Sequence, residues 1–129
     1  MARRKSSTFT EVELEFMNII WARGEASTED IQKSLEENDR YLTDGSIRKI
    51  LSILMTKGHL ERRKMGRSFY YKAKVEETQA HKNIIQDILK RAFAGSAPLM
   101  VAALLGSRGV KKGDIEEIKR LIAEYERGK

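Results

Sequence analysis

The strongest constraint on the fold is a change of hydrophobic period in the middle of the chain. Behind a candidate N-cap at Thr43, apolar side chains recur at helical spacing: Ile47, Ile50, Leu51 and Leu54. Residues 59–72 then read as a strand, a tight turn at Met65-Gly66, and a second strand rich in aromatic residues. A helix that passes directly into a glycine-turned hairpin predicts a small antiparallel sheet beside a helical core.

Two more helices are predicted before this block, each from a capping signal. Thr10 with Glu13, and Ser27 with Asp30, have the spacing of capping boxes, and Gly24 supplies a stop for the first helix. Three helices followed by a basic hairpin is the element order of a winged helix-turn-helix domain. The predicted fold class is therefore mainly α with a small β-hairpin.

Residues 75–129 return to a helical period and predict three further helices. They carry apolar stripes that a domain of this size cannot easily bury without covering its own basic face, so we expect a twin copy to cover them. We assign residues 1–74 to a winged helix-turn-helix DNA-binding domain and residues 75–129 to a helical C-terminal dimerisation region. The dimerisation residues are predicted to be Ile84, Ile85, Ile88, Leu89, Phe93, Leu99, Val101, Leu104, Leu105, Ile115, Ile118, Leu121, Ile122 and Tyr125.

Positive charge is concentrated in one segment. Residues 43–72 contain eight lysines and arginines against two acidic residues, whereas residues 6–42 contain three against nine. The chain as a whole has a formal net charge of +6. A localised basic block indicates one face that meets phosphate rather than general adhesiveness.

The predicted partner is double-stranded operator DNA, read by the third helix and gripped by the hairpin. Small and hydroxyl side chains near the helix start permit close approach to base edges, and the cations can donate to guanine or phosphate. The predicted DNA-binding residues are Thr43, Gly45, Ser46, Arg48, Lys49 and Ser52 on the helix, and Arg62, Arg63, Lys64 and Arg67 on the hairpin. A solvated helix face explains Arg48, Lys49 and Ser52 equally well when they are taken alone, but not together with the adjacent hairpin block.

Catalytic and cofactor chemistry find little support. The chain has no cysteine, which excludes disulfides and thiol chemistry and favours a cytoplasmic location. His59 and His81 lie in different elements, and His81 sits on an apolar stripe where a packed neutral imidazole is expected. We therefore predict no enzyme activity, no metal and no cofactor. Trp21 is expected to pack in the core.

Membrane targeting is not expected either. The basic start, residues 1–5, is not followed by an apolar segment, and the apolar run 99–105 is too short to span a bilayer.

The runs Phe9 to Trp21 and Gly24 to Ser27 resemble the opening of the penicillinase repressor family. Residues 46–51 and 57–60 resemble its recognition helix and the entry to its wing, residues 66–71 its wing, and residues 114–118 its last helix. The resemblance implies a homodimeric repressor whose C-terminal helices intertwine, with Gly45, Ser46 and Lys49 near the bases.

The resemblance also implies a membrane sensor-protease system as a partner in induction, without membrane insertion of this chain. At the Asn-Phe bond cut in the β-lactam branch, this chain has Ala103-Leu104, and the sequence leaves open whether this region is cleaved. The copper branch uses a Cys-x-Cys tail, which a chain without cysteine cannot supply. Lys111 stands where a capping serine is common before the last helix.

The leading hypothesis is a sequence-specific transcriptional repressor that binds a palindromic operator as a homodimer. The alternative is a winged-helix protein-interaction module that binds a partner through its acidic residues 6–42 and has only weak, non-specific DNA affinity. A hydrolase or transferase is a distant third, because it requires a coupled histidine pair that the sequence does not suggest.

Overall fold

The computed structural model describes residues 9–128, so the basic start at residues 1–5 lies outside the described residues. The chain divides into two compact units between Ile85 and Gln86, which we call unit 1 and unit 2. This division falls inside a helix, α4. The functional boundary after Lys74 stays a prediction.

Unit 1 begins with three helices that start at the predicted caps: α1 (Glu11–Arg23), α2 (Thr28–Glu37) and α3 (Asp44–Thr56). Both capping boxes form, since Thr10 and Ser27 each exchange hydrogen bonds with the acidic residue three positions later. Thr43 Oγ1 accepts the Ser46 amide hydrogen bond at 3.1 Å and caps α3. Gly24 ends α1 with φ of +81°, a conformation that favours glycine.

The core of unit 1 lies where the three helices meet the sheet. The predicted inward residues of α3 are buried, with Ile47, Leu51 and Leu54 fully enclosed and Ile50 partly so. From the other elements, the core receives Phe16, Met17, Ile20, Ala26, Ile31, Leu35, Leu60 and Tyr71. Because the apolar face of α3 is buried in this core, the opposite face of the helix is exposed to solvent.

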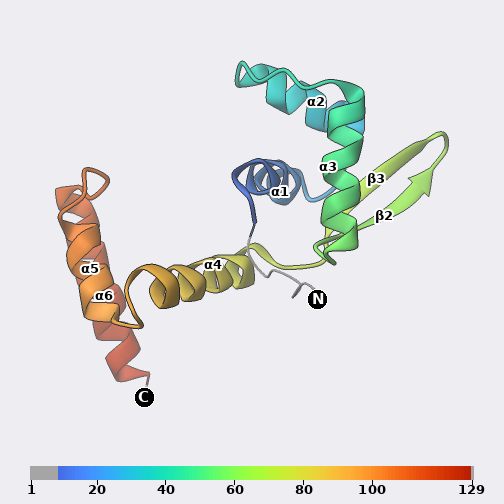
Figure 1. Cartoon of the computed structure of the whole chain (residues 1–129). Coiled ribbons are helices and arrows are strands. Elements are labelled where there is room, and N and C mark those ends of the chain that lie inside the picture. Colours follow the sequence, from blue (N-terminus) through green and yellow to red (C-terminus); the bar gives the residue numbers. More distant parts are fainter. Residues whose placement is uncertain (1–8, 129) are drawn as a thin grey trace. The chain divides into compact units, whose positions relative to one another are not determined.

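The hairpin is confirmed as β2 (Leu60–Met65) and β3 (Ser68–Ala73), which we call the wing. Met65 pairs with Ser68, so the turn is Gly66-Arg67, one residue later than predicted. Gly66 has φ of +64° and supplies the conformation that such two-residue turns require. The sequence missed a two-residue strand, β1 (Ala26–Ser27), which pairs with β3 and gives the order β1-β3-β2 among the described residues. Figure 1 shows the wing beside α3.

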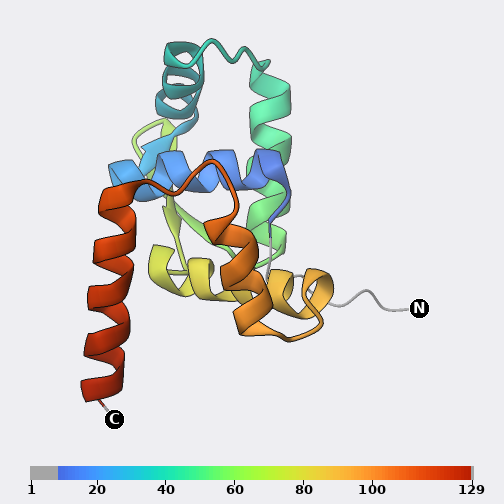
Figure 2. The same ribbon diagram turned by 90° about the vertical axis from the view of Figure 1, so that its left-hand side faces the viewer.

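The helix α4 (Glu77–Ala92) starts within unit 1. Ala80 is fully buried there, but His81 is exposed, with its imidazole 3.8 Å from the Glu77 carboxylate. The expectation of a packed His81 is therefore wrong, because the helix turns Ala80 inward instead. Trp21 is half-buried at the edge of the core, where its ring contacts His81 of α4. Figure 2 shows the first turns of α4 beside α1.

Unit 2 contains the rest of α4, then α5 (Ala97–Leu105) and α6 (Lys112–Arg127). Ser96 caps α5 as predicted, whereas the Lys111 side chain makes no capping bond, and the Asp114 carboxylate accepts from the Lys111 amide at 2.9 Å. Neither α5 nor α6 has a fully buried residue. No single described helix is long and apolar enough to cross a membrane, and only the bent pair α4 and α5 meets that criterion jointly.

Candidate nucleic-acid interface

The outward side of α3 presents the residues that the sequence singled out. Ser46, Arg48, Lys49 and Ser52 are exposed, as are Thr43 and Gly45 at the helix start. We call these six residues the α3 face. Thr43 also donates a hydrogen bond from Oγ1 to Ser46 Oγ at 3.0 Å, so two hydroxyl groups are held together at the start of the helix. The arrangement offers small polar groups at the helix start and cations one turn later.

Arg48 is already paired on its own helix. Its Nε donates to Asp44 Oδ2 at 2.7 Å, but both side chains remain more than half exposed. An ion pair in contact with water contributes little, so an incoming phosphate or guanine can displace the carboxylate at small cost.

The structure joins part of the α3 face to the wing. Arg48 and Ser52 line a shallow concavity together with Arg62 of β2, and Met55 and Tyr71 complete its wall. Two guanidinium groups and a hydroxyl group therefore surround one hollow between a helix and a strand. These are the groups that hold a DNA phosphate or the edge of a guanine.

The wing carries the remaining predicted cations, and all of them are exposed. The Arg62 guanidinium lies 4.0 Å from the centre of the Phe69 ring, which supports it on the strand surface. Arg67 lies in the turn and Lys64 lies on β2 opposite Phe69, and neither forms an ion pair among residues 9–128.

Arg63 differs from the other cations of the wing, because it is paired with Glu25, a residue outside the predicted site. Its Nε and Nη2 donate to the two Glu25 oxygens at 2.6 and 2.7 Å. This hydrogen bonding lowers the pKa of the Glu25 carboxyl and raises that of Arg63. Glu25 directly precedes β1, so the pair fastens the wing to the segment between α1 and α2. The two residues are brought together by the strand β1, which the sequence did not predict.

A second unforeseen pair supports the far end of α3. Lys57 Nζ donates to both Glu13 oxygens at 2.9 and 2.8 Å, and Glu13 also accepts from the Thr10 amide. The Glu13 side chain is 7% exposed and that of Lys57 is 28% exposed. Burial raises the pKa of Glu13, but the hydrogen bonds from Lys57 and Thr10 outweigh it and the pKa is lowered. The capping box of α1 is thereby tied to the end of the helix that carries the α3 face.

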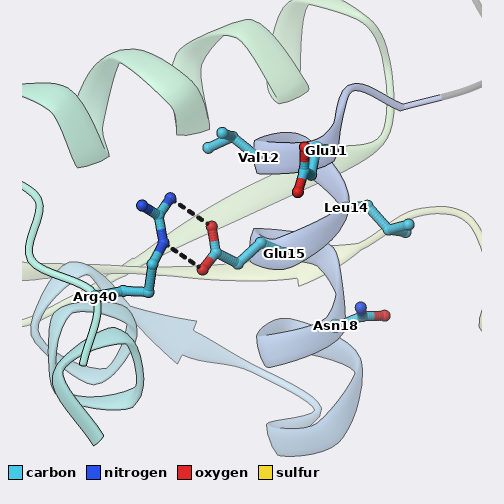
Figure 3. Close-up of a pocket in the computed structure, with 6 residues that line it drawn as sticks. All are labelled: Glu11, Val12, Leu14, Glu15, Asn18 and Arg40. Atoms are coloured by element: carbon cyan, nitrogen blue, oxygen red, sulfur yellow. Dashed lines mark hydrogen bonds and ion pairs between the residues drawn. The ribbon is translucent and has the colours of Figure 1, made fainter. Parts of the chain in front are cut away.

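A larger hollow lies elsewhere on unit 1 and has the opposite electrostatic character. Figure 3 shows it lined by Glu11, Val12, Leu14, Glu15, Asn18 and Arg40. Its one cation, Arg40, forms a two-pronged pair with Glu15 at 2.9 Å. Carboxylates on this wall repel phosphate, so the nucleic-acid interface is expected on the side of α3 and the wing.

The histidines do not assemble a catalytic site. His59 is buried with its ring centre 4.5 Å from that of Phe9, whereas His81 is exposed on α4. Among residues 9–128, no cluster of three or more histidine, aspartate or glutamate side chains is arranged to hold a metal ion.

Comparison with known proteins identifies the family of this chain. The model of the penicillinase repressor family matches residues 9–124, which is nearly the whole chain. The chain belongs to the penicillinase repressor family. The matched residues include the three helices, the wing and most of the C-terminal region, and the winged-helix fold class is confirmed.

Individual members of the penicillinase repressor family match over almost their full length. The penicillinase repressor of Bacillus licheniformis is 25% identical over 126 residues, which cover 98% of each chain. The methicillin resistance regulatory protein MecI of Staphylococcus aureus is 25% identical over 118 residues, covering 92% of this chain and 95% of its own. The solution structure of the DNA-binding domain of the repressor BlaI shares 28% identity at a TM-score of 0.51, covering 60% of this chain and 93% of that domain. These relatives are regulators and repressors rather than enzymes.

Proposed function

We propose that this protein is a transcriptional repressor that binds a palindromic operator in double-stranded DNA as a homodimer. The observation that carries the proposal is the α3 face, which lies exposed next to the basic wing while the opposite side of the same helix is buried. A recognition helix placed in the major groove uses such a face for bases, and a wing grips the flanking phosphates. Family membership supports repression as the outcome of binding.

The homodimer is supported by the apolar surface of α4, α5 and α6. None of the residues predicted for dimerisation is fully buried in the single chain. The most exposed of them are Leu99, Leu104, Leu121, Ile122 and Tyr125, each more than half exposed. Apolar surface of this extent is typical of a protein interface. A two-fold dimer presents two recognition helices about 34 Å apart, which suits a palindrome with one half-site per helical turn.

The deciding experiment is a mobility shift with the DNA upstream of the protein's own gene. We expect a sequence-selective complex that weakens sharply between low and physiological salt, because each neutralised phosphate releases counterions. Purified protein that gives no selective, salt-sensitive shift contradicts the proposal. A stable complex with another protein and sequence-blind DNA affinity would favour the interaction-module alternative, with the acidic hollow of Figure 3 as its surface.

Replacing Arg48 or Lys49 singly with alanine is expected to weaken operator binding by about 1–2 kcal/mol, or roughly five- to thirtyfold. Both side chains are exposed, so the free energy of unfolding should stay within about 0.5 kcal/mol of the parent. Fluorescence anisotropy with labelled operator measures the affinity. Lys33→Ala, an exposed cation on α2, is the matched control and should leave binding within about twofold. Equal losses in all three variants would show that only net charge matters.

Replacing Glu25 with glutamine is expected to strengthen DNA binding at low salt. The change releases Arg63 from its carboxylate, and an extra phosphate contact steepens the slope of log affinity against log salt by up to about one. A salt titration of the dissociation constant measures this slope. Glu61→Gln removes the same charge from β2 and serves as the control. The prediction fails if both variants give the same slope.

A further inference from the structure

The chain's single tryptophan, Trp21, holds the segment that leads from the wing into α4, which we call the junction. Trp21 Nε1 donates to the carbonyl oxygen of Val75 at 3.0 Å, a contact between residues 54 positions apart in the sequence. Val75 itself packs against the core and stands two residues before α4 begins. The indole therefore fixes the backbone at the point where the chain leaves the wing.

Other contacts support the same junction. The Trp21 ring meets the edge of His81, in the second turn of α4, at 6.4 Å between ring centres. Phe9 also contacts Trp21 edge-on, with 6.1 Å between the ring centres. Ala80 is fully buried in the first turn of α4, and the Lys74 amide donates to the His59 carbonyl at 2.9 Å. Every one of these contacts lies inside unit 1.

The chemistry of these contacts suits a positioning role better than plain core filling. Trp21 is half-buried, and its polar indole N–H is committed to one backbone carbonyl rather than to a side chain that can rotate. A helix is stiff over a few turns, so fixing Val75 and the first two turns sets the direction in which α4 leaves unit 1. Because the division between the two units falls inside α4, this helix is the covalent connection between unit 1 and unit 2.

We propose that Trp21 is a positioning residue that sets the operator spacing the protein accepts. The inference rests on the proposed function, because spacing has meaning only for a dimer that reads two half-sites. The joint contributes nothing to the contact of one unit 1 with one half-site. It matters only when two copies must engage both half-sites at once, since linked binding is lost when the geometry does not match.

The test uses the full chain and a duplex selected by it from a random-sequence pool. Three further probes are made from this duplex: a single half-site, and the full site with its spacer lengthened or shortened by one base pair. We expect Trp21→Phe to bind the half-site within about twofold of the parent. Its preference for the selected spacer over the altered spacers should fall at least threefold, because phenylalanine keeps a ring but cannot donate to Val75.

His81→Ala is the second variant, and its exposed position protects the fold. It removes the outer ring contact and keeps the N–H to carbonyl bond, so the spacer preference should fall in the same direction by a smaller factor. If Trp21→Phe does not fold, His81→Ala decides alone. An unchanged spacer preference at unchanged half-site affinity overturns the inference. A parent protein that selects no sequence from the pool overturns the proposed function instead, and the inference with it.

Discussion

Replacing Leu121 and Ile122 together with glutamine is expected to convert the proposed dimer into monomers and to lower operator affinity by about 10²–10⁴-fold. Both side chains are more than half exposed in the single chain, so their loss removes little from the core of one copy. In a dimer they lie on the apolar side of α6, where buried polar amides without partners oppose association. The size of the effect comes from linkage, because a monomer binds each half-site separately.

Light scattering at micromolar concentration measures the oligomeric state, and anisotropy with full-site and half-site duplexes measures binding. The full site should lose its advantage while half-site affinity changes little. The matched control is Glu116→Gln with Arg127→Gln, two glutamines on the opposite side of the same helix with no change in net charge. A monomeric parent, or a control that dissociates equally, would contradict the assignment of the dimerisation region.

Glu13→Gln is expected to lower the free energy of unfolding by about 2–3 kcal/mol at neutral pH. Removing one member of a buried ion pair costs about 3–5 kcal/mol, and the partial exposure of Lys57 reduces that figure. Glutamine keeps an oxygen for the Thr10 amide, so the loss reports the charge pair rather than the cap. Urea unfolding followed by circular dichroism measures it. Glu15→Gln is the control. Glu15 lies on the same helix as Glu13, and its pair with Arg40 is equally close but more exposed, so the change should cost less than about 1 kcal/mol.

The Glu13 pair also gives a pH dependence with a definite sign. Because the folded-state pKa of Glu13 is lowered, its contribution is complete above the ordinary pKa of a glutamate, about 4.3, and disappears as the pH falls through the lowered value. The stability difference between the parent and Glu13→Gln should therefore shrink on acidification. A difference that stays constant from neutral pH to pH values below the lowered pKa would show that Glu13 contributes through packing alone.

The sequence predicted what depends on local signals. The caps at Thr10, Ser27 and Thr43 are formed by side chains and amides three residues apart, so their patterns can be read directly. The buried face of α3 follows from helical spacing in the same way. For this reason the sequence also predicts which side of α3 is exposed, and the residues of the α3 face lie on that side.

Several of the features that were not predicted depend on contacts between distant segments. β1 has two residues, too few for a recognisable alternation, and it exists because β3 offers it a partner. The pairs Glu25–Arg63 and Glu13–Lys57 join residues 38 and 44 positions apart. The apolar neighbours of His81 predict that it is buried, but Ile85 and Ile88 of that stripe are themselves exposed in the single chain, so the stripe does not indicate burial.

Ser27 belongs to two elements at once, since it is the last residue of β1 and the N-cap of α2. Its backbone pairs with Tyr70 of the wing while its hydroxyl accepts from the Asp30 amide. No residue therefore separates β1, which pairs with the wing, from the N-cap of α2. Fraying of the wing or of α2 weakens the hydrogen bonds that hold the other element. We therefore expect the wing and α2 to open cooperatively, in a single step.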